Sequence, residues 1–97
     1  MAQVVYSARG IENLEHAFEF LLAENPTAAQ AAAEAIESAV TTLAAHPLVG
    51  RRIEGDLREL VISFGVTGHI ALYRFAVQED TVRVLALRLQ QQIGYLP

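Results

Sequence analysis

The sequence predicts an α+β fold: an N-terminal strand, then an antiparallel helical hairpin packed on one face of a mainly antiparallel sheet. Three observations support this class. Residues 8–45 repeat apolar side chains at helical spacing, with one break at a proline. Residues 57–89 form three runs rich in β-branched and aromatic residues, separated by short polar or glycine-bearing breaks, which is typical of a three-stranded meander. The 97 residues suit one domain spanning 1–97.

The first half of the chain is expected to form one short strand and two helices. The apolar run at residues 3–6 is long enough for a strand, and Ser7 is a residue type that caps helices. An amphipathic helix should then run to Asn25, because the residue before a proline avoids the helical conformation. Pro26 suits the first turn of a second, alanine-rich helix to about residue 45. Residues 46–56 are expected to be irregular.

The first break of the meander predicts a register between two strands. If Phe64 pairs with His69 across a four-residue loop, Glu59 lies opposite Arg74 on the face away from Leu60. An opposite-charge pair at those positions would contribute about 0.2–1 kcal/mol. The helical hairpin is expected to cover the other face.

The second break predicts the face of the last strand. If Val77 pairs with Thr81 across a three-residue loop, Arg88 shares the second face with Arg74 and Val84. A two-residue turn would instead place Arg88 on the first face. We adopt the three-residue loop because it collects the large apolar side chains, including Tyr73 and Leu87, on the covered face.

Composition limits the classes of function. Hydrophobic residues make up 53% of the chain, so some apolar surface is expected to contact a partner protein. The net charge is −4 and all seven basic residues are arginine, whereas a general nucleic-acid binder normally carries a basic excess. Residues 1–46 hold one Arg and six Glu (−5), and residues 47–97 hold six Arg and five acids (+1). A site for an anion is therefore expected in the second half.

Several kinds of site are not expected. The chain has no cysteine, and His16, His46 and His69 lack a second histidine at ligand spacing, so neither a metal site nor a cofactor is predicted. No leader sequence or long apolar span is present, so the cytoplasm is the expected location and no membrane is expected as a partner.

The arginines of the second half are the candidate target-binding residues: Arg51, Arg58, Arg74 and Arg88. Two interpretations remain open. Each can be a strand residue with a packed stem and a paired or solvated head. Alternatively, they form a cluster on the exposed face that binds a phosphate or an acidic partner. Tyr95 is either a general acid–base group near that cluster or a terminal side chain that covers a core edge.

Short segments in a particular order add a family resemblance. They are Val5-Tyr6-Ser7, Leu14-Glu15, Asn25-Pro26, Pro47 with Gly50-Arg51, Leu57-Arg58-Glu59-Leu60, Leu72-Tyr73-Arg74-Phe75 and Val84-Leu85-Ala86-Leu87-Arg88. Over nearly the whole chain, their order and spacing resemble the RelE/ParE superfamily, the toxins of type II toxin–antitoxin modules, also known as plasmid stabilisation proteins. The resemblance implies the fold predicted above. It also implies a cognate antitoxin whose C-terminal segment wraps the toxin, with a homodimer or a heterotetramer with antitoxin as the alternative assemblies.

The resemblance divides function into two classes. RelE-like members cleave messenger RNA in the ribosomal A site with clustered basic residues and often a C-terminal Tyr or His; here Arg58, Arg88 and Tyr95 would take those roles. ParE-like members instead poison DNA gyrase. This chain has no lysine, and Leu89, Gln90 and Gln91 stand where relatives often have a histidine followed by basic residues.

That departure favours the ParE side. The chain is therefore expected to be a toxin that acts by binding a target protein such as DNA gyrase rather than by catalysis. A ribosome-dependent mRNA endoribonuclease and a non-toxic antitoxin-binding relative are the alternatives.

Overall fold

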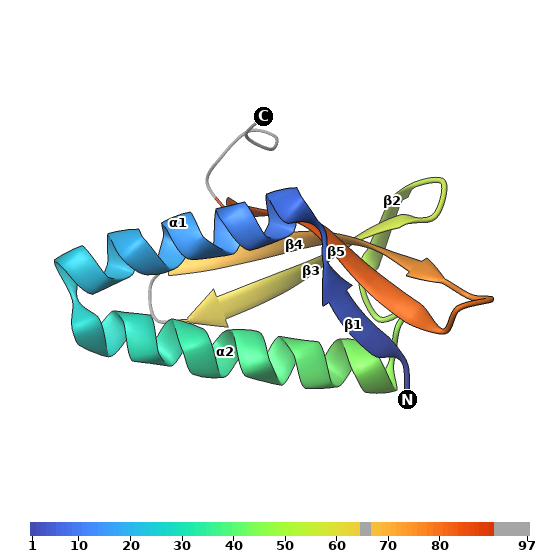
Figure 1. Ribbon diagram of the computed structural model, residues 1–97, viewed down its shortest axis with the longest axis horizontal. Helices are drawn as coiled ribbons and strands as arrows, with labels where there is room; N and C mark the ends of the chain where they lie inside the picture. The colour runs from blue at the N-terminus through green and yellow to red at the C-terminus, as the bar shows by residue number, and fades with distance from the viewer. Residues whose placement is uncertain (65–66, 91–97) are drawn as a thin grey trace.

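The computed structural model describes residues 1–64 and 67–90. In chain order the elements are β1 (Gln3–Tyr6), α1 (Ala8–Glu24), α2 (Pro26–Ala45), β2 (Arg51–Glu54), β3 (Leu57–Phe64), β4 (Thr67–Ala76) and β5 (Thr81–Leu89). Figure 1 shows α1 and α2 side by side along the sheet. The predicted α+β class and element order are confirmed. Strand β2 is an addition, because residues 46–56 were expected to be irregular throughout.

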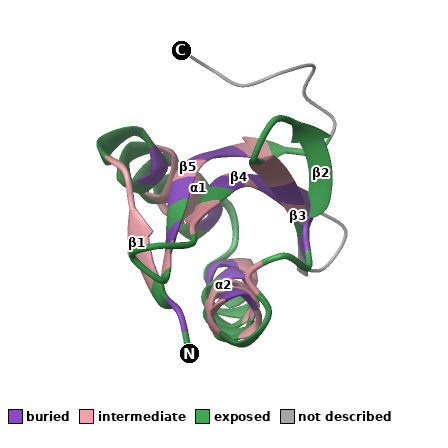
Figure 2. Ribbon diagram, turned by 90° about the vertical axis from the view of Figure 1, so that its right-hand side faces the viewer, coloured by how far each residue is buried: buried purple, intermediate pink, exposed green. Residues whose placement is uncertain are grey.

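The sheet has five strands in the order β1-β5-β4-β3-β2, with β1 parallel to β5 and every other pair antiparallel. Helix α1 packs against β5, and α2 packs against β3 and β1. Figure 2 shows the buried residues concentrated along β4 and β5, in the middle of the sheet, while β2 is exposed at the edge. The helices therefore cover one face of the sheet, as predicted.

Both helices begin at the predicted residues. The Oγ of Ser7 accepts a hydrogen bond from the amide of Gly10 (3.1 Å). The Oδ1 of Asn25 accepts from the amides of Thr27 (3.0 Å) and Ala28 (3.3 Å). These side chains satisfy amide groups that have no partner within the helix, which is why the hairpin turns within so few residues.

The predicted register of β3 with β4 is wrong by two residues. Phe64 pairs with Thr67 rather than with His69, so only residues 65 and 66 intervene between the paired positions. Glu59 consequently lies opposite Leu72 and not opposite Arg74. Because side chains alternate with a period of two, a shift of two residues leaves every side chain on its predicted face.

Strands β4 and β5 contain a β-bulge that was not predicted from the sequence. Tyr73 pairs with Val84, but Leu72 pairs with Ala86, so Leu85 is the additional residue. Beyond the bulge the register is the predicted one, and Arg88 lies opposite Ile70 on the face away from the helices. Before the bulge Thr81 pairs with Ala76 and not with Val77, so the predicted three-residue loop is wrong. The faces there are reversed, and Val84 lies on the helix-covered face.

Helix α1 supplies hydrogen bonds at this bulge. The hydroxyl of Ser7 donates to the carbonyl oxygen of Leu85 (3.0 Å). The side-chain oxygen of Asn13 accepts from the amide of Leu87 (3.0 Å). A bulge disturbs the regular hydrogen bonding of its own strand. The side chains of Ser7, the N-cap of α1, and of Asn13 within α1 bond backbone groups at and beside it.

The core lies between the helices and the covered face of the sheet. Tyr73 and Val82 are completely buried, and Leu43 of α2 is 2% exposed. Leu87 is also buried and Leu60 packs against this cluster, so the face predicted to be covered is covered. The strand residues on the opposite face are left to form a separate surface.

Candidate functional site

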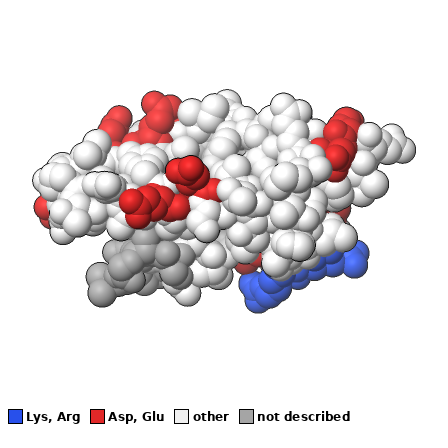
Figure 3. Space-filling model, turned by 90° about the horizontal axis from the view of Figure 1, so that it is seen from below, with Lys and Arg blue, Asp and Glu red and all other residues white. Residues whose placement is uncertain are grey.

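The face of the sheet away from the helices carries four arginines, Arg51, Arg74, Arg83 and Arg88, and two acids, Glu54 and Glu59. We call it the arginine face. Its strand residues have a net charge of +2; the rest of the chain has three Arg and nine acids, −6, and the two sum to −4. Figure 3 shows acidic side chains spread over the helical side and arginines gathered along one edge. The positive charge is therefore concentrated on this one face, and the rest of the surface is acidic.

The centre of the arginine face is a carboxylate between two guanidinium groups. Arg51 lies directly opposite Glu59 in the register of β2 and β3, and its Nη2 is 2.9 Å from Oε1 of Glu59. The Nη2 of Arg88 is 3.7 Å from the other carboxylate oxygen. The side chains of Glu59 and Arg88 are 9% and 14% exposed, whereas that of Arg51 is 77% exposed. Glu59 thus anchors both arginines and leaves Arg51 accessible to a partner.

A second group lies towards the β4–β5 turn. The Nε of Arg74 is 2.8 Å from Oδ1 of Asp56, and the two side chains are 48% and 64% exposed. An ion pair so accessible to water contributes little to stability. Arg83 lies directly opposite Arg74 across β4 and β5. The predicted ion pair of Arg74 with Glu59 is wrong, because each of these residues has a different partner.

Arg58 does not belong to the arginine face. It lies opposite Tyr73 on the helix-covered face, and its Nη1 donates to the carbonyl oxygens of Leu48 (3.1 Å) and Gly50 (2.9 Å). The expectation that Arg58, Arg74 and Arg88 cluster on one face is therefore corrected. Alternation along β3 puts Arg58 and Glu59 on opposite sides of the sheet.

Arg58 and Tyr73 together fasten the segment that leads into β2. The hydroxyl oxygen of Tyr73 accepts a hydrogen bond from the amide of Gly50 (2.8 Å). Burial raises the pKa of Tyr73 above its ordinary value, while the amide of Gly50 and the charge of Arg58 act in the opposite direction. A Cβ at position 50 would lie 2.6 Å from the Tyr73 ring, so this close approach requires glycine. These hydrogen bonds to Gly50 fix the position of the residue just before β2, and therefore the position of Arg51.

The residues named for catalysis are not brought together by the described part of the chain. Arg58 and Arg88 lie on opposite faces of the sheet. Tyr95 and Gln91 lie outside the described residues.

Arg83 was not among the candidate residues predicted from the sequence. The predicted register, extended without a bulge, would have turned this side chain towards the helices. A local signal was available, because Thr81-Val82-Arg83-Val84 alternates polar and apolar residues whereas Leu85-Ala86-Leu87 breaks the alternation.

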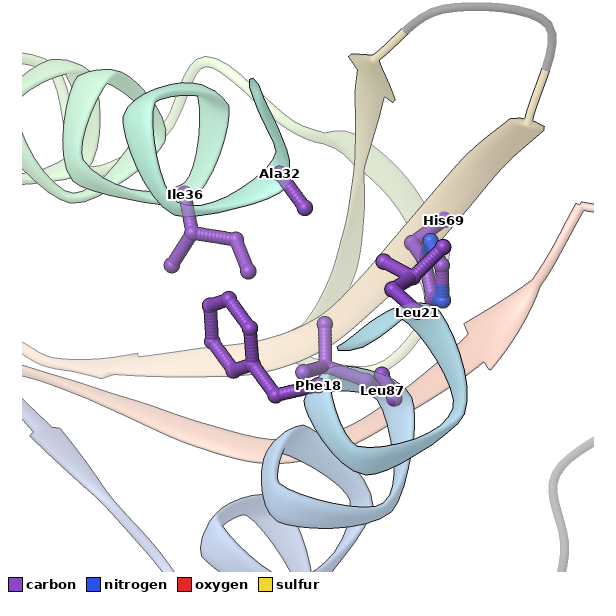
Figure 4. A pocket seen from close by; sticks show the side chains of 7 residues that line it. Phe18, Leu21, Ala32, Ile36, His69 and Leu87 are labelled. Carbon is purple, nitrogen blue, oxygen red and sulfur yellow. The ribbon is translucent and has the colours of Figure 1, made fainter. Parts of the chain in front are cut away.

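A small apolar cavity lies on the helix-covered side, between the helices and the sheet (Figure 4). Its lining includes Phe18 and Leu21 of α1, Ile36 of α2, and His69 and Leu87 of the sheet. His69 is 7% exposed, and burial lowers the pKa of its imidazole below the ordinary value of 6.5. The lining is suited to packing and not to binding a polar substrate.

Within 1–64 and 67–90, no three His, Asp or Glu side chains gather closely enough to hold a metal ion. Neither helix in that part of the chain is both long and apolar enough to cross a membrane.

Comparison with known proteins places the chain in a family. The family described as "ParE toxin of type II toxin-antitoxin system, parDE" matches residues 4–94. The curated Toxin RelE3 of Caulobacter vibrioides is 35% identical over 88 residues, covering 91% of this chain and 94% of that protein.

Two solved structures share the fold. A chain of the intact E. coli RelBE toxin–antitoxin complex superimposes with a TM-score of 0.64 at 12% identity, covering 95% of this chain and 100% of that one. A metal-bound toxin from Helicobacter pylori gives 0.55 at 13% identity, covering 97% and 100%. The chain belongs to the ParE toxin family of the RelE/ParE superfamily and is the toxin of a type II toxin–antitoxin system.

Proposed function

We propose that this toxin arrests growth by binding a target protein, DNA gyrase, through the arginine face, and that a cognate antitoxin neutralises it in the cytoplasm. The observation that carries the proposal is the charge division: +2 on the arginine face against −6 on the rest of the chain. Such polarity orients an approaching acidic surface towards one side of the molecule. An antitoxin partner agrees with the solved neighbour, which is itself a toxin–antitoxin complex.

The same face is a poor surface for a nucleic acid. Phosphate contacts supply most of the affinity of nucleic-acid binders, and they require a basic surface along the whole path of the strand. Here Glu59 already occupies the space between Arg51 and Arg88. A protein partner requires only a few charged contacts among apolar ones, and Val61 on the same face is 53% exposed.

The test uses expression without the antitoxin and purified gyrase. We expect the chain to stop growth and to inhibit supercoiling, and Arg51→Gln to raise the inhibitory concentration roughly tenfold, the effect of losing one close interfacial charge pair. Arg52→Gln is the matched control, because this adjacent arginine is also exposed but bonds the carbonyl oxygen of Gly55. Supercoiling that is untouched by the folded protein would contradict the proposal.

A second candidate is a ribosome-dependent mRNA endoribonuclease. Two observations favour it: Arg51 and Arg88 converge on Glu59, and the 35% identical relative is named a RelE toxin. Primer extension on translated messages would then show cuts positioned by codons, which Arg88→Ala abolishes. Harmless overexpression of the folded chain would instead identify a non-toxic antitoxin-binding relative.

A further inference from the structure

Arg74 and Arg83 form a like-charge pair in direct register on the arginine face. Like charges directly opposite each other destabilise a sheet. The bulge at Leu85 creates this pair, because without the additional residue Arg83 would lie on the helix-covered face. The fold therefore places the guanidinium groups of Arg74 and Arg83 side by side on an exposed surface, although their repulsion opposes folding.

The two guanidinium groups keep most of their hydrogen-bond donors available. Arg74 uses Nε for Asp56, and among the described residues its terminal nitrogens make no further bond. The guanidinium of Arg83 makes no hydrogen bond or ion pair within the same part of the chain. Each guanidinium presents five N–H donors in a planar fork, so the pair has several donors left for a ligand.

The pair borders a hollow in the surface between β1, β4, β5 and the turn after β4. Apolar contacts are offered by Val5 of β1 and Ala76 of β4, and Glu79 of the turn also borders the hollow. A ligand that enters it therefore meets two cations, a small apolar area, one acid, and the polar residues Gln3 and Thr81.

We propose that Arg74 and Arg83 bind a carboxylate, the side chain of an Asp or Glu presented by a partner protein. A carboxylate accepts paired N–H bonds from a guanidinium, and its short aliphatic stem fits against Val5 and Ala76. Its charge also relieves the repulsion between the two arginines. The inference rests on the proposed function, since it specifies the chemistry of the protein that the arginine face binds.

A single carboxylate fits this place better than a chain of phosphates. Asp56 is bonded to Arg74, and Glu79 and Asp80 occupy the adjacent turn. A nucleic-acid strand passing the pair would meet these acids with further phosphates, whereas one carboxylate needs only the gap between the arginines.

The test follows the Nε–Hε resonances of the ¹⁵N-labelled full-length protein during titration with acetyl-Ala-Glu-Ala-Glu-Ala-amide. We expect saturable shifts at Arg74 and Arg83, and none with the matched Gln peptide. Arg83→Gln should weaken binding roughly fivefold, the factor for one exposed charge pair. Arg9→Gln, which removes the same charge from the helical layer, should leave it unchanged. The unfolding midpoint of Arg83→Gln should equal or exceed that of the parent, because the repulsion is gone.

Three results would overturn the inference: no saturable shift, tighter binding of inorganic phosphate than of the peptide, or a clearly lower unfolding midpoint for Arg83→Gln. The first result would mean that the arginine pair binds no carboxylate. The second would mean that its ligand is a phosphate. The third would mean that Arg83 stabilises the fold. Because the titration uses neither cells nor gyrase, its failure is distinguishable from failure of the growth and supercoiling assays.

Discussion

At the scale of single residues, His69 shows how the fold changes the chemistry of a side chain. It lies on the helix-covered face beside Leu21 and Leu87 (Figure 4). A protonated imidazole would place a charge in this apolar surrounding, and burial therefore lowers the pKa of His69. The neutral form belongs to the folded state, while the unfolded chain titrates at its ordinary value near 6.5.

This difference predicts a pH-dependent stability. As pH falls through about 6.5, the unfolded chain binds a proton at His69 before the folded protein does. The contribution of neutral His69 is thus fully present above that pH, declines below it, and is lost once pH passes the lowered folded pKa. Urea unfolding measured between pH 7.5 and 5 should show this decline, and His69→Gln should reduce it. His16→Gln, at an exposed position, should leave the decline intact; an unchanged pH profile in His69→Gln would refute the assignment.

At the scale of elements, the contact between α1 and the bulge of β5 links the two halves of the chain. Ser7 and Asn13 bond the backbone of Leu85 and Leu87, which lie more than 70 residues away in sequence. A Cβ on Gly10 would lie 2.7 Å from the carbonyl oxygen of Val84, so α1 approaches β5 closely here. The helix therefore stabilises the irregular strand geometry that turns Arg83 to the arginine face.

Asn13→Ala should reveal the contribution of this contact. It leaves the amide of Leu87 without its acceptor, which we expect to cost about 1–3 kcal/mol of unfolding free energy. Alanine favours a helix more than asparagine does, so the measured loss of unfolding free energy is smaller than the contribution of the hydrogen bond itself. Urea denaturation checks the value, with the exposed Glu12→Ala as control. Equal stability of both variants would mean that the bulge does not depend on Asn13.

At the scale of the whole molecule, one core joins both helices to the sheet. Leu43 of α2, Tyr73 of β4 and Val82 of β5 are almost fully buried in a single cluster that also includes Leu21 of α1. We infer that the helical layer and the sheet unfold together, because neither can bury its apolar side without the other.

Leu43→Ala tests this inference. Removing a buried leucine side chain should cost about 2–5 kcal/mol, and the far-ultraviolet and tyrosine near-ultraviolet signals should shift together. Val77→Ala is the control, because this valine is 74% exposed and its truncation should change stability by less than about 0.5 kcal/mol. Two separate transitions in Leu43→Ala would show independent layers.

The sequence predictions were correct where the interactions join residues close in sequence, and were wrong where they join residues far apart. Helix limits at Ser7 and Asn25 were correct because the caps act over three residues. The face of Arg88 was also correct, because β4 and β5 have the predicted register beyond the bulge. The pairing of Phe64 was wrong, but a shift of two residues preserves the faces of β3. The roles of Arg58 and Arg83 were missed, because both depend on backbone groups that are distant along the chain or on the bulge.

The amino-acid sequence alone therefore determined the α+β class, the limits of both helices, the covered face and the family resemblance. Each of these features can be predicted from local periodicity, from capping residues or from the order of short segments. Only the tertiary structure decided that Arg58 fastens the segment before β2, that Glu59 holds Arg51 and Arg88, and that Arg83 lies opposite Arg74. These arrangements arise when α1 and the neighbouring strands satisfy backbone groups far away in sequence, which no local pattern specifies.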